Sequence, residues 1–388
     1  MIDWHKIYNL LNNQLSFKQT VSVVPQKPIF CFVADGGFTK WTGSDILTKG
    51  VGGSERWIIE MARYVKKLSS FDVYVFCNCE KNEIFEGVYY NRLTEYVKFI
   101  SICKIQHCLI SRYSEYIPVS VNSYVENIHV VLHDISLSGN VIPFDNKIKT
   151  FLCLSEWHKE NFLNVFPQFK NITHIIEHGI NFDLFKSDQI IDKIPQSFIY
   201  SSFPNRGLLN LLKMWPKIQR KYPLATLNIF TDINNVWANE NYPEELENVK
   251  NLLEIYQDKY PLIKNHGWVD TKTLSDFWKK SDVWLYPCIF QETFCLTALE
   301  AAITKTFAIT NDLAALNDVV GDGRGVIIKG NSINEDWKEE VFEVICKYLD
   351  NPKLKEPYIE KKRFILQRRD RRQLFTSTKS GTNSFLIL

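Results

Sequence analysis

Short apolar runs alternate with amphipathic helical patterns through most of this 388-residue chain, and this alternation limits the folds open to it. Runs of this length are typical of strands that helices cover on both faces, and strands that alternate with helices favour parallel sheets. We therefore predict an α/β fold of two similar halves. The expected strands are Ile29–Val33, Val73–Cys77, Cys108–Ser111, Ile128–Leu132, Thr150–Leu154, Ser197–Ser201, Thr226–Phe230, Val283–Tyr286 and Phe307–Ile309.

Helices are predicted between these strands. The first begins at Ser54, a good N-cap, and keeps its apolar residues on one face as far as Leu68. The others are Leu208–Gln219, Glu244–Tyr256, Thr271–Lys280, Phe294–Ala302 and Asn334–Leu349. The polar segment Asn181–Gln196, which contains Pro195, is a natural linker. The predicted organisation is an N-terminal extension over residues 1–28, a domain over 29–190, a second domain over 195–350 and a basic tail over 351–388.

Composition narrows the class of protein. The net charge is only +2, so nucleic acid is not expected as a partner. The nine cysteines include no Cys-x-x-Cys pair, so the sequence gives no support to a zinc ribbon. Cys31, Cys153, Cys288 and Cys295 lie in apolar runs and are expected in the core. This use of cysteine fits a reducing compartment. Neither a signal-peptide pattern nor an apolar run of ~18 residues is present. We expect a cytoplasmic protein, soluble or peripheral to a membrane.

The tail is the most basic part of the chain. Its simplest interpretation is a solvated helix with a frayed end, and the alternatives are a weak contact with an anionic membrane or an aberrant end of a once longer reading frame. The basic residues are Lys361, Lys362, Arg363, Arg368, Arg369, Arg371 and Arg372.

The first segment that could carry chemistry is the glycine-rich stretch Lys49–Glu55, which opens the first helix. Glycines let a ligand approach the backbone, and a helix N-terminus offers free N–H groups to an anion. The dinucleotide-binding fingerprint needs a third glycine where Glu55 stands, so a nicotinamide dehydrogenase is disfavoured. Alone, the stretch could equally be a turn without a ligand.

The second segment is Gln291–Ala301, which contains Glu292 and Glu300. If a helix begins near Thr293, the two carboxylates lie ~12 Å apart along its axis. They could bind two hydroxylated rings of one elongated ligand, while the N–H groups between them bind a phosphate. The alternative is a capped surface helix with a solvated glutamate.

The third segment, Tyr200–Leu208, leaves a strand and enters a helix, at the edge of a parallel sheet where such folds bind ligands. Arg206 is there a natural partner for a diphosphate, since a guanidinium makes charge-assisted bidentate bonds. The alternative is an arginine that faces water.

The histidines give little evidence of a metal site. His174–His178 matches a zinc-peptidase pattern, but its β-branched residues predict a strand that enters a turn. His129 and His133 flank an apolar strand, and only His133, at the strand's end, is well placed for a cleft. The chain has no Asp-x-Asp pair, the usual device for holding a metal on a diphosphate. We expect neither a catalytic metal nor a cofactor.

Together these segments resemble glycosyltransferase family 4, which has the GT-B fold. The resemblance runs from about residue 29 to 349 and rests on Gly52–Glu55, Leu132–Asp134, Arg206–Leu208 and the Glu292–Glu300 motif after Tyr286–Pro287, with support from Ser155–Trp157, His178–Asn181, Phe185 and His266–Trp268. It implies two Rossmann-like domains whose parallel sheets face each other across a cleft, with the acceptor on the first domain and the donor on the second. The implied activity is retaining transfer of a hexose from a nucleoside-diphosphate-sugar to an acceptor hydroxyl of a glycan, a lipid or a small molecule, as in glycan biosynthesis.

The resemblance also implies roles for single residues. Its catalytic residues would be His133, which would face the reacting sugar, Arg206 and Glu292. Glu300 would bind the donor ribose, Glu292 and the amides after it the donor sugar, and Arg206 with the glycine loop the diphosphate. The implied donor-binding residues are Gly52, Gly53, Ser202, Arg206, Glu292, Thr293, Phe294, Cys295, Leu296 and Glu300.

This chain departs from the family pattern in three places. The family has an arginine and then a lysine in the third segment, where this chain has Ser202 or Phe203 and then Arg206. Lys305 and Phe307 stand where the family usually has glycine and proline, and the long final helix of the family has only a poor counterpart here. These departures motivate an alternative function, a GT-B protein that binds a nucleotide-sugar without turnover.

Overall fold

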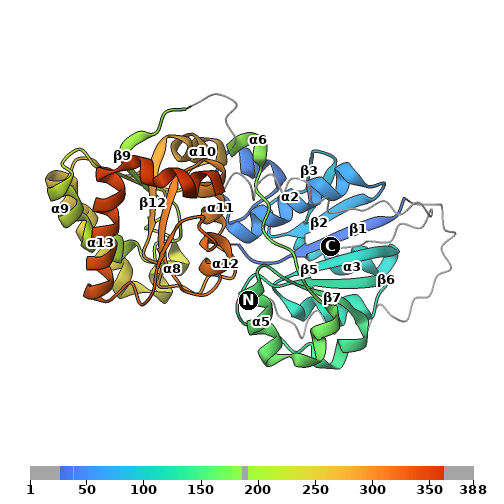
Figure 1. The fold of residues 1–388 in the computed structure, drawn as a ribbon. Helices are drawn as coiled ribbons and strands as arrows, with labels where there is room; N and C mark the ends of the chain where they lie inside the picture. Colours follow the sequence, from blue (N-terminus) through green and yellow to red (C-terminus); the bar gives the residue numbers. More distant parts are fainter. Residues whose placement is uncertain (1–26, 38, 186–190, 362–388) are drawn as a thin grey trace.

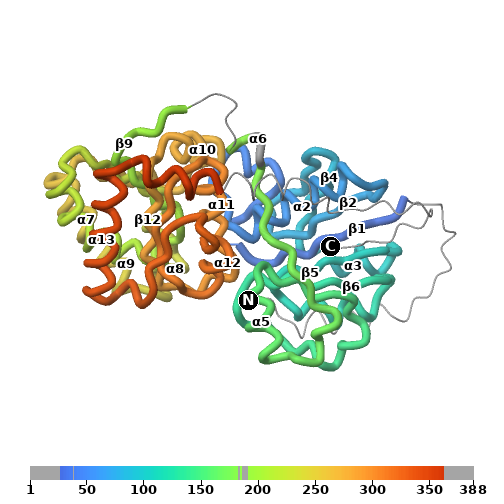
Figure 2. Tube along the Cα trace, viewed as in Figure 1, coloured from blue at the N-terminus to red at the C-terminus, as the bar shows by residue number. Residues whose placement is uncertain are grey.

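The computed structural model describes residues 27–37, 39–185 and 191–361. These residues form two lobes, each built on one sheet (Figure 1). The Cα trace in Figure 2 shows the division along the chain: the first lobe runs from blue to green, and the second lobe runs from the yellow-green of β9 to red.

The first lobe contains an eight-stranded sheet in the order β3-β4-β2-β1-β5-β6-β7-β8. Its neighbouring strands are parallel, apart from the β3–β4 hairpin at one edge. The central strand β1 is apolar and buried along its whole length, as expected for a strand covered on both faces. The strands are β1 (Ile29–Ala34), β2 (Asp72–Cys77), β3 (Glu83–Phe85), β4 (Val88–Arg92), β5 (Ile105–Ser111), β6 (Val125–Val131), β7 (Ile148–Cys153) and β8 (Thr173–Ile175).

The second lobe contains a six-stranded, wholly parallel sheet in the order β11-β10-β9-β12-β13-β14. The two sheets lie in neighbouring lobes, as in the GT-B arrangement that the family resemblance implies. The strands are β9 (Ile194–Tyr200), β10 (Thr226–Ile229), β11 (Ile263–Asn265), β12 (Ser281–Tyr286), β13 (Phe307–Asn311) and β14 (Val326–Ile328).

Helices cover both sheets, and two of them, α2 and α11, lie where the lobes meet (Figure 1). The α-helices are α2 (Gly53–Leu68), α3 (Tyr96–Ile102), α4 (Ile117–Val121), α5 (Glu156–Val165), α6 (Phe182–Phe185), α7 (Leu208–Lys221), α8 (Val236–Asn241), α9 (Pro243–Lys259), α10 (Thr271–Lys280), α11 (Leu296–Ile303), α12 (Leu316–Val320) and α13 (Glu335–Asp350). Short 3₁₀ turns are η1 (Gly43–Leu47), η2 (Leu93–Glu95), η3 (Ser114–Tyr116), η4 (Ile142–Lys147), η5 (Pro167–Ile172) and η6 (Pro352–Lys355).

Every predicted strand and helix is present, with its ends moved by a few residues. The linker prediction over Asn181–Gln196 was wrong at both ends, because α6 occupies its beginning and β9 begins at Ile194. Pro195 therefore lies inside a central strand. The strand tolerates it because the pairing with β12 shifts register there and Gln196 adopts a positive φ of 61°, as in a bulge.

The beginning of the predicted tail packs against the second lobe. Lys355 is buried and its Nζ lies 2.7 and 2.8 Å from the two carboxylate oxygens of Asp282. Tyr358 contacts the ring of Phe307 and hydrogen-bonds the hydroxyl of Tyr348 at 2.9 Å. Residues 351–361 therefore belong to the second lobe, while residues 362–388, with most of the basic cluster, and the extension over 1–26 lie outside the described residues.

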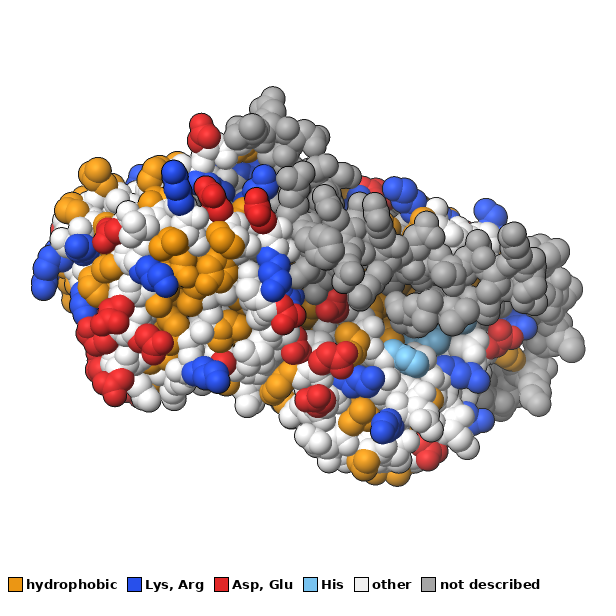
Figure 3. All heavy atoms as spheres, in the orientation of Figure 1, with side chains coloured by type: hydrophobic (Ala, Val, Ile, Leu, Met, Phe, Trp, Pro, Cys, Tyr) orange, Lys and Arg blue, Asp and Glu red, His pale blue; other side chains and the backbone are white. Residues whose placement is uncertain are grey.

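The described surface carries no large region of one sign on the face in Figure 3, where lysines and arginines are interspersed with aspartates and glutamates. All nine cysteines lie within the described ranges as free thiols, and Cys31, Cys153, Cys288 and Cys295 are buried as predicted. The helices of the described residues include none long and apolar enough to cross a bilayer.

Candidate functional site at the contact between the lobes

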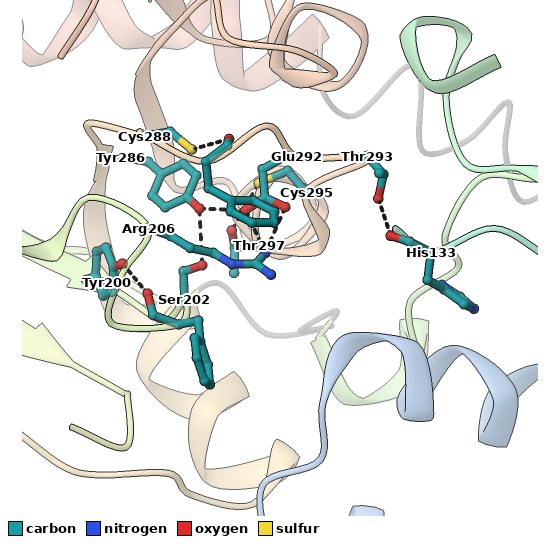
Figure 4. A network of polar contacts seen from close by, with 12 residues as sticks. His133, Tyr200, Ser202, Arg206, Tyr286, Cys288, Glu292, Thr293, Cys295 and Thr297 are labelled. Carbon is teal, nitrogen blue, oxygen red and sulfur yellow. Dashed lines mark hydrogen bonds and ion pairs between the residues drawn. The ribbon is translucent and has the colours of Figure 1, made fainter. Parts of the chain in front are cut away.

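The site is built where the loops after β9 and β12 meet the start of α11. Arg206 follows β9 and Glu292 lies in the loop between β12 and α11, so these residues, 86 positions apart, come together at the carboxyl edge of the second sheet. Figure 4 shows the polar network that joins them. This is the edge at which parallel α/β sheets bind ligands.

Arg206 and Glu292 form an ion pair. Nη1 of Arg206 lies 2.9 Å from each carboxylate oxygen of Glu292, and the ring of Phe290 lies 4.0 Å from the guanidinium carbon. The hydroxyl of Tyr286 donates to Oε1 of Glu292 at 2.7 Å and lies 3.1 Å from Oγ of Ser202. The side chain of Glu292 is 8% exposed and that of Arg206 is 30% exposed, so the arginine is the more accessible partner.

Electrostatics keep Arg206 protonated. Burial lowers the pKa of Arg206, but the carboxylate of Glu292 more than offsets it, and the net shift raises the pKa above its ordinary value. A guanidinium whose partner is one carboxylate can exchange that partner for another anion, such as a phosphate.

The turn between Glu292 and α11 crosses the contact between the lobes. The helix begins at Leu296, two residues later than predicted, because Cys295 has a left-handed backbone with φ of 76°. Oγ1 of Thr293 donates to the carbonyl of His133 at 2.9 Å, and the Thr293 carbonyl accepts from Oγ of Ser155 at 2.8 Å. The residues predicted to bind the donor sugar are thus held directly against the first lobe.

His133 reaches this contact through its backbone. Its ring points away from the Arg206–Glu292 pair in Figure 4 and lies against the rings of Trp57 and His178, with centroids 5.4 and 5.9 Å away. Burial, followed by the charge of Arg112, holds the pKa of His133 well below its usual range, so the imidazole is neutral at pH 7. Its Nε2 atom is buried without a hydrogen-bond partner among the described residues.

Glu300, on α11, also has an arginine partner, but that partner comes from the other lobe. Nη1 of Arg56, in the first turn of α2, lies 2.7 Å from Oε1 of Glu300, and the two side chains are 10% and 2% exposed. Burial raises the pKa of Glu300, and Arg56 opposes this shift. Both predicted donor-binding carboxylates are therefore paired with arginines.

The glycine loop lies against the second lobe at the same place. A Cβ on Gly50 would lie 2.3 Å from Cδ1 of Trp268, so this position needs a glycine for close packing. Gly52 is the N-cap of α2, and a Cβ on Gly53 would meet no described atom within 4 Å. Of the predicted residues, Thr293 crosses between the lobes, Ser202 lies beside Tyr286 in the second lobe, and Gly52 and Gly53 begin α2 next to Gly50. Phe294 and Cys295 are buried in the turn, and Leu296 is half-buried at the start of α11.

Three residues of the site were not predicted as functional from the sequence: Arg56, Phe290 and Trp268. Arg56 directly follows the glycine loop, which is a signal in hindsight, but a charged residue in the first turn of a helix is ordinarily exposed to water. The pattern His174–His178 is a strand followed by a turn, as predicted: Thr173–Ile175 form β8, so the two histidines do not share a helical face.

Buried neutral histidines near the site give a testable pH dependence. Burial lowers the pKa of His129 and of His178 to about 3, and that of His158 to about 4. The unfolded chain therefore binds more protons than the folded chain below pH 6.5, and stability must fall as the pH falls from about 6.5 toward 3–4. We expect each histidine to cost ~2 kcal/mol of unfolding free energy at pH 5 relative to pH 7.

Thermal or urea unfolding at pH 7 and at pH 5 measures this loss. His129→Asn should reduce the pH dependence clearly, whereas the matched change at the exposed His174, whose pKa burial lowers less, should reduce it by a smaller amount. Equal stability at the two pH values would contradict the expectation.

Comparisons with known proteins agree with this architecture. Residues 196–351 match the family model described as glycosyl transferases group 1. A stretch of 80 residues is 34% identical to an uncharacterized 41.2 kDa protein in the cps region of Klebsiella pneumoniae. The matched stretch is 21% of this chain, and it spans only about a fifth (21%) of the length of that relative.

Solved structures resemble nearly the whole chain. Sucrose-phosphate synthase from Thermosynechococcus elongatus superimposes with a TM-score of 0.65 at 13% identity, over 87% of this chain and 94% of that one. HepE from Anabaena, crystallised with UDP and glucose, has a TM-score of 0.61 at 13% identity, over 88% of this chain and 95% of that one. Identities this low show the fold alone. The chain has the GT-B fold, and its residues 196–351 match the family model of glycosyl transferases group 1.

Proposed function

We propose that this protein is a retaining glycosyltransferase of family 4, which moves a hexose from a nucleoside-diphosphate-sugar to an acceptor hydroxyl without a catalytic metal or cofactor. The observation that carries the proposal is the placement of Glu292 and Glu300, inside the matched family region, as two buried carboxylates at the contact between the lobes. Nucleotide-sugars offer the hydroxyl groups that such carboxylates bind and the phosphates that Arg206 binds.

The geometry supports one sequence of events. The donor's sugar hydroxyls donate to Glu292, and its diphosphate takes the place of that carboxylate beside Arg206. The bond from the anomeric carbon to the diphosphate breaks, and Arg206 with backbone N–H groups stabilises the charge on the leaving oxygens. The acceptor hydroxyl attacks the anomeric carbon from the same face and passes its proton to the leaving phosphate, so no enzyme nucleophile is needed.

The proposed role of His133 is to form a hydrogen bond with the reacting sugar, which its neutral imidazole allows. An imidazole without charge accepts or donates a hydrogen bond without adding charge to the reacting sugar, and its unpartnered Nε2 is available for such a bond. Because that ring turns away from Arg206 in Figure 4, contact with the sugar requires the lobes or the ring to move.

Support for a nucleoside diphosphate also comes from HepE, whose structure contains UDP and glucose. From this similarity we infer only that this chain binds a nucleoside diphosphate, and not which base or sugar it binds. The first lobe would bind the acceptor and the second the donor, in a cytoplasmic protein that is soluble or peripheral to a membrane.

A screen of UDP-, GDP- and ADP-sugars tests the proposal, with thermal shift as the measure of binding and sugar release or transfer as the measure of turnover. We expect one donor class to raise the unfolding temperature and to be consumed, also in the presence of EDTA, and NMR of the early product should show the donor's anomeric configuration. Binding without consumption would favour the alternative function, and activity that EDTA abolishes and manganese restores would contradict the metal-independent mechanism. No thermal shift with any donor would overturn the proposed function.

A further inference from the structure

Arg56 connects the two lobes at the donor site. Its backbone N–H donates to the carbonyl of Gly52 at 2.9 Å, which places it in the first turn of α2 directly after the glycine loop. Its side chain crosses to Glu300, and its guanidinium carbon lies 5.4 Å from the ring centroid of Phe185. The arginine is therefore held between α2, α6 and α11.

The Arg56–Glu300 pair leaves a buried guanidinium nitrogen without a partner. Nη1 of Arg56 and Oε1 of Glu300 form the contact, whereas Nη2 of Arg56 has no hydrogen-bond partner in the described part of the chain. The carboxylate of Glu300 is also stabilised by the side chain of Trp278, so Glu300 does not depend on Arg56 alone. A buried charged donor without a partner is costly, and Nη2 of Arg56 is therefore available to an anion that binds beside Glu300.

The number of cations near the donor site also indicates a role for Arg56 in binding a diphosphate. The loop after β9 supplies one cation, Arg206, and Ser202 stands near the position where the resembling family has another. Lys49 is engaged elsewhere, with the carbonyl of Lys40 at 2.7 Å and the carboxylate of Asp45 at 3.2 Å. Lys305 lies beyond the last residue of α11, at the opposite end from the Glu292 turn. Unlike Lys49 and Lys305, Arg56 is already in contact with a predicted donor-binding carboxylate, Glu300.

We propose that Arg56 is a donor-positioning residue: its guanidinium supplies the second cation for the phosphates of a nucleoside diphosphate while Glu300 accepts the ribose hydroxyls. This inference rests on the proposed function. It makes donor binding a cross-lobe event, because the first lobe contributes a charge to a ligand seated on the second. If Arg56 only joined the lobes, it would make no contact with the phosphates. Removal of its charge would then leave the affinity for a nucleoside diphosphate unchanged or increase it.

The test compares UDP with uridine by calorimetric titration, and uses GDP with guanosine or ADP with adenosine if the donor screen selects those bases. Arg56→Gln keeps a hydrogen-bond donor for Glu300 but removes the charge. We expect it to weaken nucleoside diphosphate binding by about tenfold or more and nucleoside binding by less than about twofold. Arg56→Lys should recover part of the loss, because a point charge attracts phosphate without a bidentate geometry.

Arg92→Gln is the matched control. Arg92 ends β4 and pairs with Glu95 on the surface of the first lobe. Its loss should leave the affinity for UDP unchanged, and thermal unfolding of each variant shows whether it is folded.

The outcomes separate the two proposals. An Arg56→Gln variant that binds UDP as well as or better than the parent protein overturns the inference and leaves the proposed function standing. Equal losses for UDP and uridine also overturn it, because they indicate a general distortion of the site. If the Gln variant does not fold, the Lys variant decides: equal affinity for UDP in parent and variant counts against a bidentate phosphate contact. A parent protein that binds no nucleotide overturns the proposed function itself.

Discussion

Arg206→Ala is expected to lower kcat/KM for sugar transfer by the equivalent of ~2–4 kcal/mol, because the leaving diphosphate would lose its main cation in the second lobe. The structure adds a second reason. Glu292 would keep its bond from Tyr286 but lose its ionic partner, and a buried carboxylate that has lost its partner destabilises the site around it. Both effects act on the donor site.

The measurement is kcat/KM together with the affinity for the nucleoside diphosphate, in parent, Arg206→Ala and Arg206→Lys proteins. The lysine variant should recover only part of the activity, because a lysine cannot bind two oxygens in parallel. Arg220→Ala, at the exposed end of α7, is the matched control and should change kcat/KM by less than ~0.5 kcal/mol. An Arg206→Ala variant as active as its Arg220 counterpart would mean that Arg206 only neutralises Glu292.

The fold could be predicted from the sequence because the pattern that forms it is local. Most of the longer strands contain an apolar run, and each long helix repeats its apolar residues on one face, so neither needs distant contacts to be recognised. The more polar strand β4 and three-residue strands such as β11 and β14 were missed because such segments have no clear apolar period, and their pairing depends on neighbours elsewhere in the chain. Pro195 misled the prediction of the linker because a bulge, invisible in the sequence, accommodates it.

The candidate site could be predicted only as a set of residues, not as a set of contacts. Glu292, Glu300 and Arg206 were chosen for the chemistry of their side chains. The partner of Glu300 depends on how the two lobes meet, because Arg56 is 244 positions away in the first lobe, and the partner of Glu292 depends on how two loops of the second sheet meet. The backbone at Lys305, by contrast, follows the family pattern although the residue does not. Lys305 replaces the usual glycine of the resembling family, and its φ of 61° is in the left-handed region that glycine favours.

Gly207→Ala is expected to have the largest effect on folding of any single methyl group added to this site. Gly207 caps α7 with a φ of 108°, which costs a residue with a Cβ ~1–2 kcal/mol. A Cβ there would also lie 2.1 Å from the carbonyl oxygen of Pro287. That carbonyl is held in place, because it accepts a hydrogen bond of 3.0 Å from the hydroxyl of Ser332, which is fully buried and in turn lies 3.2 Å from Nδ2 of Asn210.

The substitution must therefore move either the helix start that follows Arg206 or the loop that leads to Glu292, and both movements separate the pair on which the proposed chemistry depends. We expect a loss of ~2–5 kcal/mol in the free energy of unfolding, the sum of backbone strain and overpacking, together with loss of transfer activity in the folded fraction. Urea unfolding measures the first quantity and a rate corrected for the folded fraction measures the second. Gly179→Ala is the control, since its Cβ would meet no described atom within 4 Å and its φ is not positive, and its stability should change by less than ~1 kcal/mol. If Gly207→Ala were as stable and as active as Gly179→Ala, the Pro287 carbonyl would have to move freely, and the close contact between these two loops could not be what positions Arg206 against Glu292.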